Sequence, residues 1–145
     1  MSIAFLSFWT VLMITAAAAL IWGGRPEKAV ASMYVAAAVG TILVRPAMTI
    51  RYGSVEVSVF AIDVLLLIGL TIVVVRSDRW WTVCAMALQS LTVLAHVGRM
   101  FNPHLWRLGY QIMAEWAAWP TLLLLAYGIW SARRRRSRPT PISPG

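Results

Sequence analysis

Residues 55 to 97 read VEVSVFAIDVLLLIGLTIVVVRSDRWWTVCAMALQSLTVLAHV, which is two long apolar runs joined by the short polar turn RSDR. A helix needs roughly 20 apolar residues to cross the hydrocarbon core of a bilayer, and both runs are close to that length. Within lipid, a helix satisfies its backbone hydrogen bonds inside one segment, whereas an open strand does not. The stretch therefore predicts two antiparallel transmembrane helices, over residues 55–75 and 80–97.

The rest of the chain has the same apolar character. Hydrophobic residues make up 60% and charged residues 12% of its 145 residues, and the mean hydropathy is +0.73. Such a composition is typical of an integral membrane protein rather than a soluble domain. Further apolar runs cover residues 3–22, 29–44 and 110–130, so we predict an all-α integral membrane protein, a compact bundle of five transmembrane helices. Because the 29–44 run is short, four spans plus a short or re-entrant segment is the alternative.

The distribution of Lys and Arg predicts the orientation. With five spans and a cytoplasmic C-terminus, nine of the thirteen basic residues lie on the cytoplasmic side, as the positive-inside rule requires. The same arrangement puts Trp22, Trp80, Trp81 and Trp130 at cytoplasmic ends of spans, where tryptophan side chains favour the headgroup region. We therefore predict an N-terminus outside and a C-terminus in the cytoplasm.

Residues 132–145 form a basic tail. A run of arginines followed by Pro and Ser does not bury apolar surface, so we predict that this tail is disordered. The arginines either mark the cytoplasmic side alone or also bind anionic lipid headgroups. They are Arg133, Arg134, Arg135, Arg136 and Arg138. The lipid bilayer is the expected partner, and nothing elsewhere in the sequence points to nucleic acid.

The two runs of residues 55–97 carry polar residues at helical spacing. Glu56 and Asp63 are seven residues apart, as are Gln89 and His96, so each pair shares one face of its helix. In antiparallel helices, residues at equal distances from the outer ends lie at the same depth. By this criterion Asp63 pairs with Gln89 and Glu56 pairs with His96. Together with Arg99, just beyond the 80–97 run, and Glu115, near the outer end of the 110–130 run, they predict a polar intramembrane cluster of Glu56, Asp63, Gln89, His96, Arg99 and Glu115.

Ionisable groups inside a membrane are costly and usually have a function or a polar partner. The cluster predicts either a proton or ion path, with Asp63 as its deepest carboxylate, or a hydrogen-bonded clamp between helices. Alternatively, His96 ligates haem or a chlorophyll-type pigment. The second histidine, His104, lies in a predicted loop, and we find no metal-ligand spacing and no catalytic motif. We therefore predict no catalytic residues, no metal site and no cofactor, with the pigment as the alternative.

Helix packing has its own pattern in the 29–44 run. Ser32, Ala36 and Gly40 recur every four residues, and such a ridge of small side chains lets a neighbouring helix backbone approach closely. The neighbour is either another helix of this chain or a second molecule. We therefore expect a homo-oligomer or association with other membrane subunits.

Four stretches of the sequence, GGRPEKA, VFAIDVLLL, RSDRWW and ALQSLTVLAH, occur in an order that resembles a group of small uncharacterised bacterial inner-membrane proteins. That group has an Arg-Pro-Glu turn after the first span, an acidic third span, and a Ser-Asp-Arg-Trp-Trp turn before a fourth span with Gln and His. The resemblance covers most of residues 20–130 and implies a multi-pass protein of the bacterial inner (cytoplasmic) membrane. It implies no activity, because none is known for the group.

The function predicted from the sequence is non-enzymatic. The small size, the minimal loops and the ridge of small side chains favour an accessory or scaffold subunit that associates with itself or with a larger membrane complex. A small oligomeric transporter or proton-coupled channel that uses Asp63 is the first alternative. A haem- or pigment-binding membrane subunit that uses His96 is the second.

Overall fold

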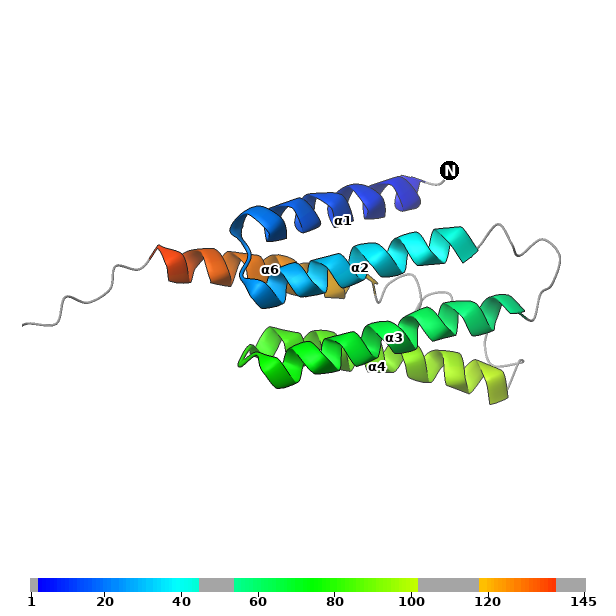
Figure 1. Ribbon diagram of the computed structural model, residues 1–145. Coiled ribbons are helices and arrows are strands. Elements are labelled where there is room, and N and C mark those ends of the chain that lie inside the picture. Colours follow the sequence, from blue (N-terminus) through cyan, green and yellow to red (C-terminus); the bar gives the residue numbers. More distant parts are fainter. Residues whose placement is uncertain (1–2, 45–53, 102–117, 138–145) are drawn as a thin grey trace, which may run out of the picture.

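The computed structural model describes residues 3–44, 54–101 and 118–137, and within them it contains five helices and no strand (Figure 1). This helical content confirms the predicted all-α class. The predicted 3–22, 55–75 and 80–97 runs are helical over their whole length. The helices are α1 (Ile3–Trp22), α2 (Arg25–Val44), α3 (Ser54–Arg76), α4 (Trp80–Phe101) and α6 (Ala118–Arg136).

Three of these helices are long and apolar enough to cross a membrane: α2, the Val57–Arg76 part of α3 and the Trp80–Gly98 part of α4. Large apolar side chains cover the outside of the bundle, as expected for a surface that faces lipid. The described residues therefore support a membrane location with three candidate spans. Side chains more than 60% exposed include Leu20, Leu43, Leu65, Leu94 and Leu123.

The helices lie side by side, and α1 to α4 alternate in direction (Figure 1). Helix α1 contacts α2 and α6, α3 contacts α2 and α4, and both α2 and α4 contact α6. In lipid, such helix packing is stabilised by close van der Waals contact rather than by exclusion of water. The centre of the bundle is filled by Leu12, Leu70, Trp81, Leu122 and Leu125, each at most 2% exposed.

Helix α2 begins four residues earlier than the predicted 29–44 run, because the Gly-Arg-Pro-Glu turn caps it. The Gly24 carbonyl accepts the first helical hydrogen bond, from the Lys28 N–H at 3.1 Å. The Glu27 carboxylate accepts a hydrogen bond from the Gly24 N–H at 2.9 Å, which is the reciprocal half of a capping box. The helix has 20 residues, about 30 Å at 1.5 Å per residue, so it is not too short to span.

Helix α6 continues through the basic run to Arg136, so the prediction that disorder begins at residue 132 is wrong for residues 132–136. Basic side chains are favourable in the last turn of a helix, where the carbonyl groups carry partial negative charge. Arg135 adds a direct bond, from Nη2 to Ser131 Oγ at 2.7 Å. Residues 110–117 of the predicted last span and residues 138–145 lie outside the described residues.

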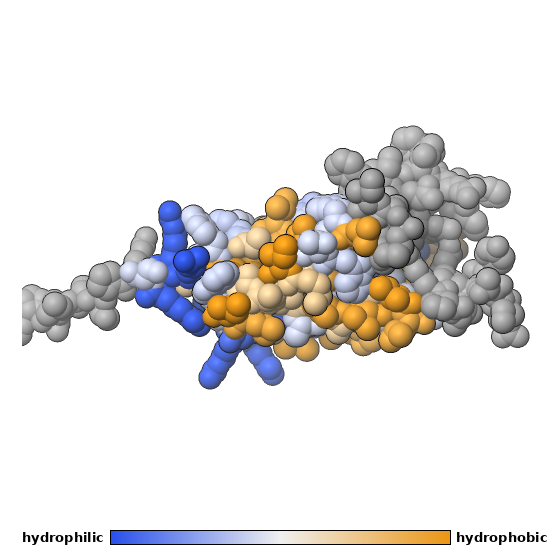
Figure 2. Space-filling model, turned by 90° about the horizontal axis from the view of Figure 1, so that it is seen from above, coloured by the Kyte–Doolittle hydropathy of each residue, from blue (hydrophilic) through white to orange (hydrophobic). Residues whose placement is uncertain are grey.

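Five helix ends meet at one end of the bundle (Figure 1): α1, α3 and α6 end there, and α2 and α4 begin there. Hydrophilic side chains gather at this end, whereas hydrophobic ones cover the length of the bundle (Figure 2). We call it the basic end. Its Lys and Arg residues are Arg25, Lys28, Arg76, Arg79, Arg133, Arg134, Arg135 and Arg136.

Three of the four tryptophans predicted for an interfacial belt are exposed at the basic end. Trp22, Trp80 and Trp130 are 44%, 60% and 48% exposed. Trp81 is not part of the belt, because it is 1% exposed and its indole ring packs against Gly128 of α6. Consecutive residues in a helix are rotated by about 100°, so Trp80 lies on the outside of the bundle whereas Trp81 lies in its interior.

Candidate functional site

Asp63 of α3 contacts two side chains of α4. Gln89 Nε2 donates to Asp63 Oδ1 at 3.0 Å and to the Asp63 backbone carbonyl at 3.2 Å. His96 Nε2 lies 3.0 Å from Asp63 Oδ2, where its N–H donates to the carboxylate. Both oxygens of the carboxylate therefore have a partner on the neighbouring helix. We call Asp63, Gln89 and His96 the polar cluster.

The contact between Asp63 and Gln89 is the one expected from the sequence, whereas the contact between His96 and Asp63 was not predicted. The predicted contact between His96 and Glu56 falls on a side chain outside the described residues. The helix register explains why His96 reaches Asp63. Residues 77–79 separate α3 from α4, so position 93 is as far from the centre of the turn as Asp63. Gln89 and His96 lie about one helical turn on either side of that level and on one face, so one carboxylate reaches both.

The polar cluster lies in the interior of the α3–α4 pair. Gln89 and His96 are 6% and 7% exposed, and the Asp63 side chain is 19% exposed. Asp63 stands nine residues after the start of α3, ~14 Å along the helix. If α3 crosses a bilayer, this is hydrocarbon depth, where an unpartnered carboxylate is strongly disfavoured. The amide and imidazole donors offset that cost.

This arrangement supports two kinds of behaviour. A carboxylate and an imidazole 3.0 Å apart are the kinds of side chain that form proton relays in membrane proteins. The same three contacts also fix the register of α3 against α4, because the hydrogen bonds are lost if one helix slides by a turn. The Phe60 ring, 6.2 Å from the His96 ring, packs beside the imidazole.

The other three residues of the predicted cluster lie outside the described part of the molecule. The backbones of Glu56 and Arg99 belong to α3 and α4, but their side chains are outside it, and Glu115 is outside it entirely. Among the residues that the structure describes, no group of three or more His, Cys, Asp and Glu side chains is arranged to hold a metal ion.

Sequence reasoning missed a second polar site, at the basic end. Glu27 is fully buried, and its Oε1 lies 3.5 Å from Nη1 of Arg79 in the α3–α4 turn. Nearby, Arg136 Nη2 donates to the Gly23 carbonyl at 3.2 Å. The α1–α2 turn, the α3–α4 turn and the end of α6 are thus tied together. Glu27, three residues after Gly24 at the start of an apolar run, is the acidic half of a capping box and predicts part of it.

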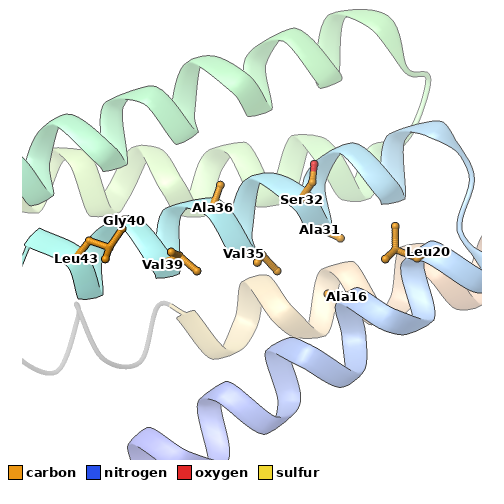
Figure 3. A pocket seen from close by; sticks show the side chains of 9 residues that line it. All are labelled: Ala16, Leu20, Ala31, Ser32, Val35, Ala36, Val39, Gly40 and Leu43. Carbon is orange, nitrogen blue, oxygen red and sulfur yellow. The ribbon is translucent and has the colours of Figure 1, made fainter.

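The ridge of small side chains borders an apolar groove of about 580 Å³ between α1 and α2. Helix α1 diverges from α2 beyond their turn, and side chains of both helices line the groove (Figure 3). Ser32 and Ala36 are exposed, whereas Gly40 also faces α3, since a Cβ there would lie 3.4 Å from Ile62. The lining residues are Ala16, Leu20, Ala31, Ser32, Val35, Ala36, Val39, Gly40 and Leu43.

The chain matches no protein-family model, no curated protein and no solved structure.

Proposed function

We propose that this chain is a non-enzymatic accessory or scaffold subunit of a membrane, and that it associates through the exposed face of α2. The observation that carries the proposal is the groove beside Ser32, Ala36 and Gly40, which stays open on the outside while the centre of the bundle is filled. A ridge of small side chains lets a second helix approach until the two backbones are close, which maximises van der Waals contact in lipid.

The occupant we propose is α2 of a second copy, with a helix of a larger complex as the alternative. A ridge of small side chains is self-complementary, so two copies related by a twofold axis can pack ridge against ridge. The Ser32 hydroxyl already donates to the Ala29 carbonyl at 2.8 Å, so it requires no polar partner across an apolar interface.

Replacing Ser32 with leucine should weaken self-association about tenfold, because the larger side chain keeps the second backbone away. Energy transfer between donor-labelled and acceptor-labelled copies in lipid vesicles measures the effect. Thr71→Leu is the matched control, since Thr71 is exposed on α3 and also donates to its own helix, at 2.8 Å to Leu67. Equal energy transfer in the wild type and in Ser32→Leu would exclude this interface between copies. If one defined subunit instead co-purified with the wild type but not with Ser32→Leu, that subunit would identify the larger complex.

A small oligomeric proton-coupled transporter is the second candidate, favoured by the 3.0 Å contact between Asp63 and His96. Proton relays of membrane pumps and transporters are built from Asp, Glu and His side chains inside the membrane. Ligation of haem or pigment is less compatible with this contact, because the Nε2 atom of His96 is held by Asp63. The proposal therefore includes no cofactor.

Replacing Asp63 with asparagine should lower proton flux into vesicles at least tenfold if the polar cluster carries protons, because the amide does not titrate. A pH-sensitive dye inside the vesicles measures the flux. Asp78→Asn is the control, since Asp78 is an exposed carboxylate in the α3–α4 turn. If proton flux into vesicles with the wild-type protein were no faster than into vesicles without protein, the transporter function would be excluded.

We also propose five spans in a bacterial inner membrane, with the N-terminus outside and the basic end in the cytoplasm. The gathering of basic residues at one end of the bundle supports this orientation. In a Cys84→Ser background, a cysteine introduced at Ser137 should react with a membrane-impermeant maleimide in inverted vesicles. Labelling in intact cells would instead show that the end of the chain with residue 137 faces the outside.

A further inference from the structure

The four consecutive arginines at the end of α6 use their side chains in two different ways. Arg135 donates from Nε and Nη2 to the carbonyl and hydroxyl oxygens of Ser131, at 3.3 and 2.7 Å. Arg136 donates to the Gly23 carbonyl at 3.2 Å. The Arg135 guanidinium therefore binds its own helix, and that of Arg136 binds the α1–α2 turn.

Arg133 and Arg134 instead lie over tryptophan rings. The Arg133 guanidinium carbon is 5.1 Å from the centre of the Trp22 ring, and that of Arg134 is 4.1 Å from the centre of the Trp130 ring. Both side chains are exposed, and neither makes a hydrogen bond or ion pair to another described residue. Because guanidinium donors point outward in the plane of the group, stacking on a ring leaves them free to bind an oxyanion.

The ring below Arg134 is part of a larger aromatic surface. The Tyr127 ring centre is 5.8 Å from that of Trp130 and 5.1 Å from that of Trp80, so three exposed rings cover the seam between α6 and α4. Tyrosine and tryptophan rings favour the layer just inside the lipid headgroups. Arg134 lies one helical turn beyond Trp130, so its guanidinium would be at the level of the lipid phosphates when the rings lie in that layer.

The net positive charge at the basic end favours binding of an anionic ligand. Eight Lys and Arg residues gather there, against two acidic ones, and Glu27 is buried beside Arg79. An anionic lipid leaflet attracts such a surface, whereas a zwitterionic lipid has no net charge to contribute.

We infer that Arg134, together with Trp130, Tyr127 and Trp80, binds the phosphate of an anionic phospholipid at the seam between α4 and α6. The guanidinium donates to the phosphate, and the aromatic rings contact the glycerol region and the upper acyl chain. A free phosphate ion would use the guanidinium but not the rings, so a lipid fits the whole surface better. This inference deepens the proposed membrane placement and rests on it.

Quenching of tryptophan fluorescence by brominated lipids tests the site in the full-length protein. In phosphatidylcholine vesicles that contain a minor fraction of phosphatidylglycerol, we expect brominated phosphatidylglycerol to quench more strongly than brominated phosphatidylcholine at the same fraction. Arg134→Gln should lower the relative affinity for phosphatidylglycerol about fivefold. Arg135→Gln removes the same charge one residue away and should lower that affinity by a clearly smaller factor, because the Arg135 guanidinium is bound to Ser131.

Three outcomes would overturn the inference. Equal losses in Arg134→Gln and Arg135→Gln would mean that only total charge matters. Relief of phosphatidylglycerol quenching by inorganic phosphate would mean that the site takes soluble anions. If neither brominated lipid quenched the wild-type protein, the membrane placement would be refuted as well. This third outcome differs from the first two because quenching by phosphatidylcholine is then also lost.

Discussion

Replacing Gly128 with alanine is expected to destabilise the bundle by about 1–3 kcal/mol, although alanine is the better helix former. A Cβ at residue 128 would lie 2.6 Å from Cε2 and 2.9 Å from Cζ2 of Trp81, closer than real Cβ atoms approach such atoms. The indole ring has no room to move, because Trp81 is 1% exposed in the centre of the bundle. Helices α4 and α6 must therefore separate.

Unfolding of the purified protein in mixed micelles, with increasing dodecyl sulfate, measures this loss. Gly98→Ala in α4 is the matched control, because a Cβ at residue 98 meets no atom within 4 Å. We expect that control to keep its stability or to gain up to about 1 kcal/mol from the higher helix propensity of alanine. Equal behaviour of the two variants would show that the close contact between α4 and α6 is not present in the protein.

Replacing Glu27 with alanine is expected to cost about 3 kcal/mol, from two separate losses. Arg79 keeps its charge but loses its partner, and removal of one member of a buried ion pair typically costs 3–5 kcal/mol. We expect about 2 kcal/mol for this loss, below that range, because the Arg79 side chain is 23% exposed and retains some contact with water. The Gly24 N–H also loses its acceptor, which weakens the start of α2 by about 1 kcal/mol within that total.

A double-mutant cycle separates the ion pair from the helix cap. Arg79→Ala and the double variant Glu27→Ala/Arg79→Ala should show a coupling of at least about 1 kcal/mol in the same unfolding assay. Asp78→Ala is the control, since this exposed carboxylate is in the same turn as Arg79 and should change the stability by less than about 0.5 kcal/mol. If Glu27→Ala were no more destabilising than Asp78→Ala, the ion pair would be unimportant for the fold.

The sequence predicted the helices well where apolar runs are long and bounded by charge. It predicted the 3–22 run with the bounds of α1, and it placed the α3–α4 turn correctly at RSDR. It was wrong at the start of α2 and at the end of α6, because charged residues there are helical. Glu27 caps its helix, and basic side chains are favourable in the last turn of α6, where Arg135 donates to the Ser131 carbonyl, so charge does not mark the end of either helix.

For the candidate site, the sequence placed Asp63, Gln89 and His96 on facing sides of neighbouring helices, because a spacing of seven keeps residues on one face. It predicted the contact between Asp63 and Gln89 but not the one between His96 and Asp63. Periodicity gives the face of a helix but not its exact axial shift against a neighbour, and that shift decides which residues one carboxylate reaches. The buried Glu27 escaped prediction for a related reason, since its partner Arg79 is distant in the sequence.

By itself, the sequence determined that this chain is helical, apolar and basic at one end, because composition and period are local properties. Only the tertiary structure decided how these helices use their side chains. It joined Glu27 to Arg79, placed both oxygens of Asp63 against α4, buried Trp81 beside Gly128 and left one face of α2 open. Each of these depends on the distance between residues far apart in the sequence, which is fixed when the helices pack.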